Sequence, residues 1–365
     1  MTKARERMKL IRVFRRSMLL QATFAILAIA AMGPVWPRSG RASARLMPGD
    51  FLPSSSSASF VTVERAGDGS FRYLVNGSPQ VFIGMGYNPI YRYLSDEERA
   101  ENYDRDFKIL CEAGVNHIIG WDADKGYEQD KFDELTLDYA EKYAIGVVMP
   151  FYLPVEGDYT DEAFTRSLME EVAKKVERFR DHPALRMWGV GNEVLVEMSS
   201  DSMRAAFCQF YPRIVDLIHE LDPNHPVIYR EAEDVFLSAI SEWFGNDEER
   251  PWLLYGMNIY TMELERILDT WPSEGLNHPL IVTEFGAEPD SPEGRAIGYL
   301  SMWRMIRAHP EYVLGGAPYA WTTAGPEPTD VIWGLMDENS QPVDDTFEQL
   351  AEEWRQESEE QRRTL

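Results

Sequence analysis

Short apolar segments alternate with longer amphipathic segments along the chain from about residue 60 onward. The short segments are rich in β-branched and aromatic residues, and most are apolar throughout instead of alternating with polar positions. Such segments are typical of strands that are covered on both faces, as in a parallel sheet. The expected strands are 81–87, 115–121, 145–152, 185–191, 226–230, 253–260, 279–284 and 313–321.

Helix-like segments lie between most of these strands. The first, 95–114, begins at the N-cap residue Ser95, carries acidic residues in its first turn and ends at Gly114, as helices commonly do. Further helices are expected at 131–144, 161–181, 201–222, 234–244, 292–309 and 345–363.

This order of elements predicts the fold class. Eight strands, each followed by a helix or a helical turn over about 290 residues, predict an α/β protein with a (β/α)8 TIM barrel. The alternative is an open doubly wound sheet, which would usually carry a glycine-rich phosphate turn after its first strand. The segment GMGYNPI at 84–90 is not such a turn. A short hairpin, 60–77 with its turn at Gly67–Gly69, is expected before the barrel.

The first residues of the chain have the pattern of an export signal. Residues 3–16 are basic, residues 17–32 are apolar and uncharged, and an Ala-x-Ala site follows at Ala42–Ala44, as in secretory signals. Arg15 and Arg16 stand at the position of a twin-arginine pair. We therefore expect a periplasmic or extracellular protein with no stable membrane span after cleavage; an uncleaved membrane anchor is the alternative.

The chain therefore divides into three expected parts. Residues 1–44 are the export signal, 45–59 are a Pro/Ser-rich linker, and 60–365 form the catalytic barrel.

Charge and composition exclude several classes of partner. Asp and Glu total 61 against 36 Lys and Arg, for a net charge of −25. Because residues 1–45 carry +9, residues 46–365 carry −34, and so acidic a body repels nucleic acid. The six His show no metal-binding spacing, and Cys111 and Cys208 are too far apart in the expected fold for a disulfide. No metal and no cofactor is expected.

Two carboxylates end apolar strands of the expected barrel. Asn192 and Glu193 end the fourth strand, and Glu284 ends the seventh. A carboxylate placed after an apolar run is costly to bury without a partner. The carboxyl ends of barrel strands form the active-site mouth, and two carboxylates across one mouth are what glycoside hydrolysis requires. An oligo- or polysaccharide is therefore the expected substrate.

The other strand ends offer mainly aromatic rings and amides, which suit a sugar because the C–H faces of pyranoses pack on flat rings. Glu231 is expected either to line the mouth or to pair with its neighbour Arg230. The predicted substrate-binding residues at these ends are Tyr87, Asn88, Trp121 and Asp122.

Two motifs carry a resemblance to a known clan. WGVGNEV at 188–194 and LIVTEFG at 280–286 resemble the two signatures of clan A retaining glycoside hydrolases. Residues 71–89 are similar to the entry into the barrel in families 2, 5 and 72. The segments that most resemble family 72 glucanosyltransferases and family 2 barrel domains are 181–194, 246–260 and 333–343.

The resemblance implies a role for five residues. Glu193 would be the general acid/base and Glu284 the nucleophile, while Asn192 would bind the 2-hydroxyl of the sugar being cleaved. Tyr260 would donate a hydrogen bond to the nucleophile, and Trp321 would form the floor of the site.

The sequence departs from the clan at the second strand. The clan often has an Arg there, and Ile119 takes its position in this chain. Arg230 and His117 are both candidates for the missing support of the nucleophile. We expect a retaining hydrolase or transglycosylase that acts on a β-glucan. The alternatives are a carbohydrate-binding barrel without catalysis and an anchored envelope scaffold.

Overall fold

The computed structural model describes most of the chain after the expected linker. The expected signal, nearly all of the linker and Asp122 lie outside the described residues. The described residues are 58–121, 132–237, 240, 244, 249–261, 263–275, 277–287 and 292–364.

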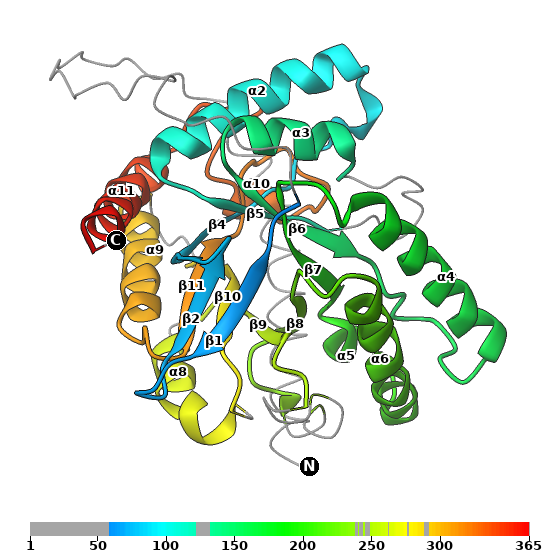
Figure 1. Ribbon diagram of the computed structural model, residues 1–365. Helices are drawn as coiled ribbons and strands as arrows, with labels where there is room; N and C mark the ends of the chain where they lie inside the picture. Colours follow the sequence, from blue (N-terminus) through cyan, green and yellow to red (C-terminus); the bar gives the residue numbers. More distant parts are fainter. Residues whose placement is uncertain are drawn as a thin grey trace, which may run out of the picture.

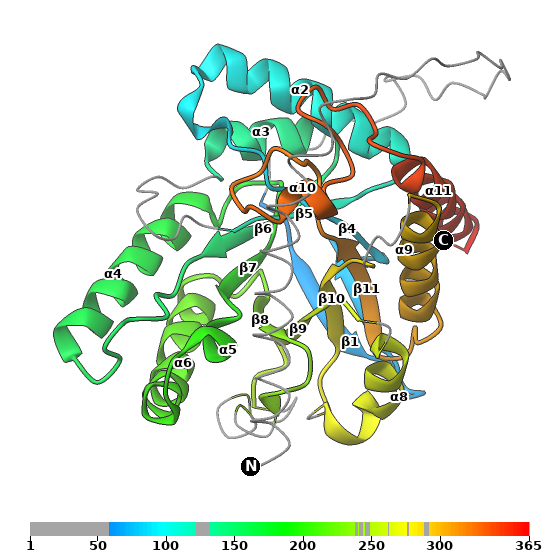
Figure 2. The same cartoon turned by 180° about the vertical axis from the view of Figure 1, so that it is seen from behind.

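Eight parallel strands close into a barrel, so the predicted fold class is confirmed (Figures 1 and 2). Their order around the barrel is β10-β11-β4-β5-β6-β7-β8-β9. Each lies within or close to a segment that the apolar pattern predicted. The strands are β4 (Phe82–Gly86), β5 (His117–Ile119), β6 (Gly146–Phe151), β7 (Leu185–Asn192), β8 (Val227–Ala232), β9 (Leu253–Ile259), β10 (Leu280–Phe285) and β11 (Val313–Pro318).

The interior of the barrel is filled by apolar side chains from every strand, which explains why the strands are apolar on both faces. These side chains are Phe82, Ile119, Val148, Met187, Ile228, Leu254, Ile281, Leu314 and Ala317. A second, larger cluster fills the space between the strands and the helices.

A small antiparallel sheet closes the amino-terminal end of the barrel. It consists of β1 (Val61–Arg65), β2 (Phe71–Val75) and β3 (Ser78–Pro79), and it crosses the barrel end nearest the viewer in Figure 1. Its Tyr73 packs against the interior cluster, and the Tyr73 hydroxyl lies 2.8 Å from Nε2 of His117. The expected hairpin is therefore part of the barrel's core, and His117 belongs to its closed end.

Ser59 begins the contacts between the amino-terminal segment and the barrel. Its hydroxyl donates to the carbonyl of Leu185 and lies 2.8 Å from Nε2 of His225. The other ring nitrogen of His225 is 2.7 Å from Asp222. The chain thus joins the barrel at the end opposite the mouth.

Helices surround the strands, and most match the expected segments. Ser95 forms a capping box with Glu98, and Gly114 ends the same helix with φ 92°, a conformation that favours glycine. The helix at 264–274, which contains Pro272, was not expected. The expected helix at 234–244 is only partly described. The helices are α2 (Asp96–Ala113), α3 (Glu134–Lys142), α4 (Glu162–Phe179), α5 (Val194–Glu197), α6 (Asp201–Leu221), α8 (Leu264–Glu274), α9 (Pro292–Arg307), α10 (Asp330–Trp333) and α11 (Thr346–Thr364), with a 3₁₀ turn, η2, at Tyr91–Tyr93.

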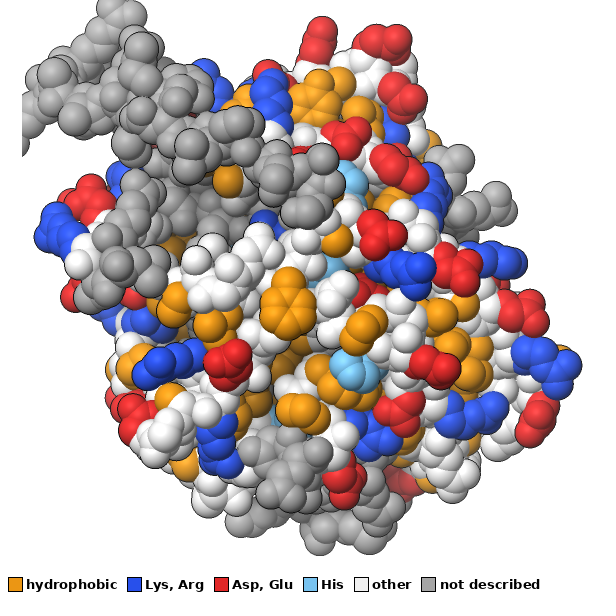
Figure 3. Space-filling model, viewed as in Figure 1, with side chains coloured by type: hydrophobic (Ala, Val, Ile, Leu, Met, Phe, Trp, Pro, Cys, Tyr) orange, Lys and Arg blue, Asp and Glu red, His pale blue; other side chains and the backbone are white. Residues whose placement is uncertain are grey.

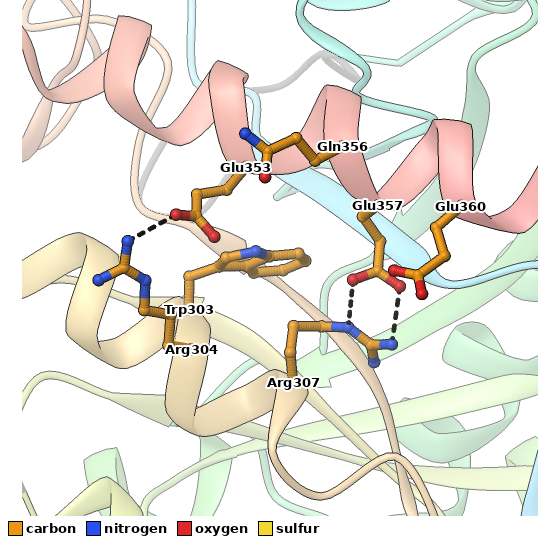
Figure 4. Close-up of a pocket in the computed structure, with 7 residues that line it drawn as sticks. All are labelled: Trp303, Arg304, Arg307, Glu353, Gln356, Glu357 and Glu360. Carbon is orange, nitrogen blue, oxygen red and sulfur yellow. Dashed lines mark hydrogen bonds and ion pairs between the residues drawn. The ribbon is translucent and has the colours of Figure 1, made fainter.

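Ion pairs join the last two long helices. Arg304 of α9 pairs with Glu353 of α11 at 2.6 Å, and Arg307 pairs with Glu357 through two hydrogen bonds (Figure 4). A shallow pocket lies between these pairs, with Trp303 at its base. Because both arginines of the pocket pair with glutamates of α11, we interpret the pocket as part of the contact between the two helices, the α9–α11 seam.

The described surface carries charges of both signs. Acidic and basic side chains are interspersed over the face seen in Figure 3. Within the described ranges, no helix is both long and apolar enough to cross a membrane.

Candidate active site

The two glutamates predicted to be catalytic lie at the same end of the barrel. Glu193 directly follows β7, and Glu284 is the fifth residue of β10. Both are largely buried, with exposed fractions of 6% and 5%. The site is therefore at the carboxyl-terminal mouth, where barrel enzymes carry out their chemistry.

Each carboxylate oxygen of Glu284 accepts a hydrogen bond. The Tyr260 hydroxyl, just after β9, donates to Oε2 at 2.5 Å, and Nε1 of Trp121, just after β5, donates to Oε1 at 2.9 Å. The two donors come from different sides of the barrel, so they fix the plane of the carboxylate.

Asn258 binds Glu193 and lies opposite Glu284 in the sheet. Its amide donates to Oε1 of Glu193 and to Oδ1 of Asn192, both at 3.1 Å, and its own oxygen accepts from the Thr283 hydroxyl at 2.8 Å. Asn258 is also the register partner of Glu284 between β9 and β10. It was not among the predicted site residues, although a buried amide in the apolar run LLYGMNIY is a signal that could have identified it.

The negative charge of Glu193 acts on the Glu284 carboxyl group. Burial, followed by the negative charge of Glu193, raises the pKa of Glu284 to about 7, while the hydrogen bonds from Tyr260 and Trp121 and the charge of Arg230 act in the opposite direction. Burial and the charge of Glu284 also raise the pKa of Tyr260 well above its usual value. Tyr260 therefore stays protonated and remains a donor to Glu284.

Arg230 crosses the barrel interior from β8 toward β5. Its Nη1 donates to the carbonyl of Gly120 at 3.0 Å, and its guanidinium carbon lies 5.9 Å from the centre of the Trp121 ring. Glycines on both neighbouring strands leave room for the side chain: a Cβ on Gly189 would lie 3.7 Å from Cζ of Arg230, and one on Gly256 would lie 2.9 Å from Cγ.

The position of Arg230 decides between the two candidates for supporting Glu284. His117 is bound to Tyr73 at the closed end of the barrel, whereas Arg230 lies beneath the Trp121 ring that contacts Glu284. Ile119 packs in the apolar interior. The positive charge that acts on Glu284 therefore comes from Arg230 of β8.

Tyr319, and not Trp321, forms part of the aromatic wall at Glu284. The Tyr319 ring lies 5.2 Å from Trp121 and 6.1 Å from Tyr260, between centroids. Trp321 was expected at the floor of the site, but the structure buries it completely, with its ring against Tyr87 and Phe347. Beyond the end of β11, the Trp321 ring fills the space between the barrel and α11.

Tyr87 and Asn88 were predicted to contact sugar, and the structure places both in buried networks. The Tyr87 hydroxyl donates to Asp106 of α2 at 2.8 Å, within the cluster outside the barrel. The Asn88 side chain exchanges two hydrogen bonds of 2.9 Å with the backbone of Thr322. Asn88 thereby holds the loop after β11, and neither residue joins the donors around Glu284.

Glu231 does not pair with Arg230 in the described interactions. Successive strand residues point to opposite faces, so Arg230 enters the barrel and Glu231 lies outside it. The Glu231 carboxylate accepts hydrogen bonds from Tyr229, Ala232 and Leu195. Within the described part of the chain, no group of three or more His, Cys, Asp or Glu side chains is arranged to hold a metal ion.

Comparisons with known proteins agree with this fold. Residues 138–317 match the family model described as "Glycosyl hydrolases family 2, TIM barrel domain". The chain is 24% identical to β-glucuronidase of Sus scrofa, over 60% of this chain and 32% of that protein, and 27% identical to β-mannosidase of Mus musculus, over 36% and 14%. It thus spans a third or less of these relatives.

Solved structures with the same fold include two glycosidases. The crystal structure of Bacteroides uniformis β-glucuronidase superposes with a TM-score of 0.62 at 18% identity, covering 81% of this chain and 37% of that one. The family 2 β-galacturonidase of Eisenbergiella tayi, bound to galacturonate, gives a TM-score of 0.62 at 19% identity, covering 82% and 54%.

Proposed function

We propose that this chain, which contains the TIM barrel domain of glycosyl hydrolases family 2, is a retaining β-glycosidase or transglycosidase that acts by double displacement. The observation that carries the proposal is the environment of Glu284. Its two oxygens accept hydrogen bonds from Tyr260 and Trp121, and the negative charge of Glu193 contributes to raising its pKa.

In the first step, a carboxylate oxygen of Glu284 attacks the anomeric carbon. The bond from that carbon to the leaving oxygen breaks, and Glu193 transfers its proton to this oxygen. Hydrogen bonds to both oxygens favour the ionised form of Glu284. The proposed step requires Glu284 as a carboxylate and Glu193 with its proton.

In the second step, Glu193 acts as a base. It takes a proton from water or from a sugar hydroxyl, whose oxygen attacks the anomeric carbon and releases Glu284 as a carboxylate. Water gives hydrolysis, and a sugar hydroxyl gives a new glycoside. The configuration at the anomeric carbon is inverted twice and so retained.

A neutral β-glucan is the proposed substrate. The likeness of three segments to family 72 glucanosyltransferases supports both a glucan and a sugar acceptor. The charge of −34 on residues 46–365 disfavours binding of a polyanionic polysaccharide. Aromatic rings at the mouth, including Trp121 and Tyr319, suit the flat faces of glucose units. We further propose that the amino-terminal signal exports the protein to the periplasm or beyond.

Substitution of the two glutamates tests the chemistry. Glu193→Gln and Glu284→Gln are each expected to abolish turnover of unactivated glycosides, because each removes a group that forms or breaks a bond. Azide should restore turnover of a dinitrophenyl glycoside by Glu193→Ala, since azide attacks the glycosyl-enzyme without a base. Wild-type activity in either Gln variant would refute the assignment.

A product screen tests the substrate and the stereochemistry. β-1,3-, β-1,4- and β-1,6-glucans and the aryl β-glucoside, mannoside, glucuronide and galacturonide are offered to the wild-type protein. Mass spectrometry detects chains longer than the substrate, and proton NMR follows the first-formed anomer. We expect a β-anomer from a neutral glucan. Initial release of the α-anomer would contradict double displacement, and a preference for the uronides would contradict the glucan proposal.

A further inference from the structure

We propose that Glu231 is a positioning residue that fixes the direction in which Glu193 presents its carboxyl group to the substrate. The inference rests on the role proposed above for Glu193. The observation behind it is that Glu231, which is fully buried outside the barrel, binds the backbone N–H of Leu195, two residues after Glu193.

Glu193 has an unusual backbone conformation. Its φ of 51° and ψ of 31° lie in the left-handed region, which glutamate rarely adopts. Glu193 is also the N-cap residue of the short helix α5, yet its side chain makes no capping hydrogen bond to that helix. The side chain of an N-cap residue usually accepts a hydrogen bond from a backbone N–H of the first turn. The carboxyl group of Glu193 does not have this role.

Glu231 supplies the missing acceptor from the neighbouring strand. Its Oε2 accepts the backbone N–H of Leu195 at 3.0 Å and the hydroxyl of Tyr229 at 2.6 Å, and its Oε1 accepts the N–H of Ala232 at 2.8 Å. The backbone N–H of Glu193 donates to the carbonyl of Arg230 at 2.9 Å. Residues on β8 thus hold the backbone on both sides of the Glu193 side chain.

Arg204 of α6 holds the same segment from the other side. Its Nε donates to the carbonyl of Leu195 at 2.7 Å, and its Nη2 donates to the carbonyl of Met198. Leu195 is therefore clamped through its N–H by Glu231 and through its C=O by Arg204. The left-handed turn at Glu193 has little freedom to relax while both clamps are present.

The carboxyl of Glu231 also faces the charge of Glu193. Burial is the main reason that the pKa of Glu231 is raised to about 7, and the negative charge of Glu193 contributes to the increase. An apolar side chain could fill the same volume without the cost of burying a carboxyl group. We therefore attribute the carboxyl group at this position to the hydrogen bonds that it accepts from Leu195 and Tyr229.

The test exploits the dependence of acid catalysis on the leaving group. A dinitrophenolate leaves without a proton, whereas an alkyl or unsubstituted phenyl alcohol needs one from Glu193. We compare kcat/KM, which reports the first step, for a dinitrophenyl and a phenyl glycoside. In Glu231→Gln we expect kcat/KM to fall about tenfold or more for the phenyl glycoside and less than about threefold for the dinitrophenyl glycoside.

A matched control separates positioning from general loss of packing. Asp106 of α2 is another fully buried carboxyl group that accepts tyrosine hydroxyls, from Tyr87 and Tyr91. Asp106→Asn is expected to lower the melting temperature without changing the ratio of the two kcat/KM values. An unchanged ratio in folded Glu231→Gln would overturn the proposal.

A second variant covers the case in which Glu231→Gln fails to fold. Tyr229→Phe removes only the hydroxyl donor to Glu231, and we expect the ratio to shift in the same direction by about threefold. No shift in folded Tyr229→Phe would then overturn the proposal. Glu193→Gln serves as the reference: if it does not lower the phenyl rate selectively, the proposed function itself fails, whatever Glu231 does.

Discussion

Arg230 places a positive charge inside the barrel, toward Glu284. Its charge lowers the pKa of Glu284 against the larger effect of burial. Gly256 on β9 leaves space for the stem of the side chain, because a Cβ there would lie 2.9 Å from Cγ of Arg230. A Cβ on Gly189 of β7 would be in ordinary contact with the guanidinium, at 3.7 Å from Cζ.

Arg230→Met tests this electrostatic role. Methionine keeps an unbranched apolar stem of comparable reach but removes the charge, so the pKa of Glu284 should rise further and less of it should be ionised in acid. We expect the acid limb of the kcat/KM profile to move up by about one pH unit. The profile is measured from pH 4 to 9 with a dinitrophenyl glycoside.

Arg186→Met is the control for Arg230→Met. Arg186 donates to the carbonyls of Pro183 and Leu185 at the start of β7, at the closed end of the barrel. Loss of its charge is expected to leave the acid limb in place. Equal movement of the limb in both variants would show that Arg230 has no specific effect on the nucleophile.

The sequence could identify the glutamates but not their support. Glu193 and Glu284 stand out because each ends an apolar strand. Arg230 and His117 were both candidates for supporting Glu284, and the choice depends on which end of the barrel each side chain occupies. The strand register and the position of the β1–β3 sheet determine these places. Likewise, the path of the chain after β11 determines that Tyr319, and not Trp321, lies near Glu284. The residue types alone do not indicate this path.

At the scale of elements, strands were more predictable than helices. The eight strands lie in short runs that are apolar throughout, a pattern that predicts burial on both faces. Helix α8 contains Pro272, and the four-residue helices α5 and α10 are too short to show a 3.6-residue period. Their formation depends on contacts from other elements, as the clamp on Leu195 illustrates.

The seam between α9 and α11 predicts a contrast between apolar and charged contacts. Trp354 is fully buried, with its ring 6.2 Å from Trp303 and 6.1 Å from Phe347, whereas Arg304 is mostly exposed. Trp354→Ala is expected to lower the free energy of unfolding by about 3–5 kcal/mol. Arg304→Met should have little effect, because an exposed ion pair stabilises a protein only slightly.

Urea unfolding of both variants measures this contrast. The midpoint should fall for Trp354→Ala at an unchanged slope, and it should stay near the wild-type value for Arg304→Met. A larger loss in Arg304→Met than in Trp354→Ala would mean that the charged pairs, and not the tryptophan, hold α11 on the barrel.

At the scale of the whole molecule, the two ends of the barrel have separate tasks. The β1–β3 sheet and Ser59 close the amino-terminal end, while both glutamates lie at the other end. The chain therefore enters the barrel on the side away from the mouth.

Three buried carboxyl groups make the fold sensitive to alkaline pH. Burial is the main cause that raises the pKa of Glu284 and Glu231 to about 7 and that of Asp330 to about 6. A carboxyl group whose pKa is higher in the folded state binds its proton more tightly there. Its contribution to stability is fully present below the unfolded pKa and is lost as the pH rises through the folded one.

Glu231→Gln isolates one of these three contributions. Glutamine cannot ionise, so the variant should gain stability relative to the wild type as the pH rises from about 4.5 to 8, by about 3 kcal/mol for a shift of this size. Urea unfolding at intervals across this range gives the difference, and any constant loss from altered hydrogen bonds cancels. Glu98→Gln provides a control whose difference from wild type should stay constant over this range, because hydrogen bonds from Ser95 lower the pKa of Glu98 and its contribution is lost only in more acidic solution. A constant difference in stability between Glu231→Gln and wild type across this pH range would contradict the prediction. It would mean that the Glu231 carboxyl group has the same pKa in the folded and unfolded chains. The hydrogen bond from Leu195 to Glu231 would then not depend on the protonation of Glu231.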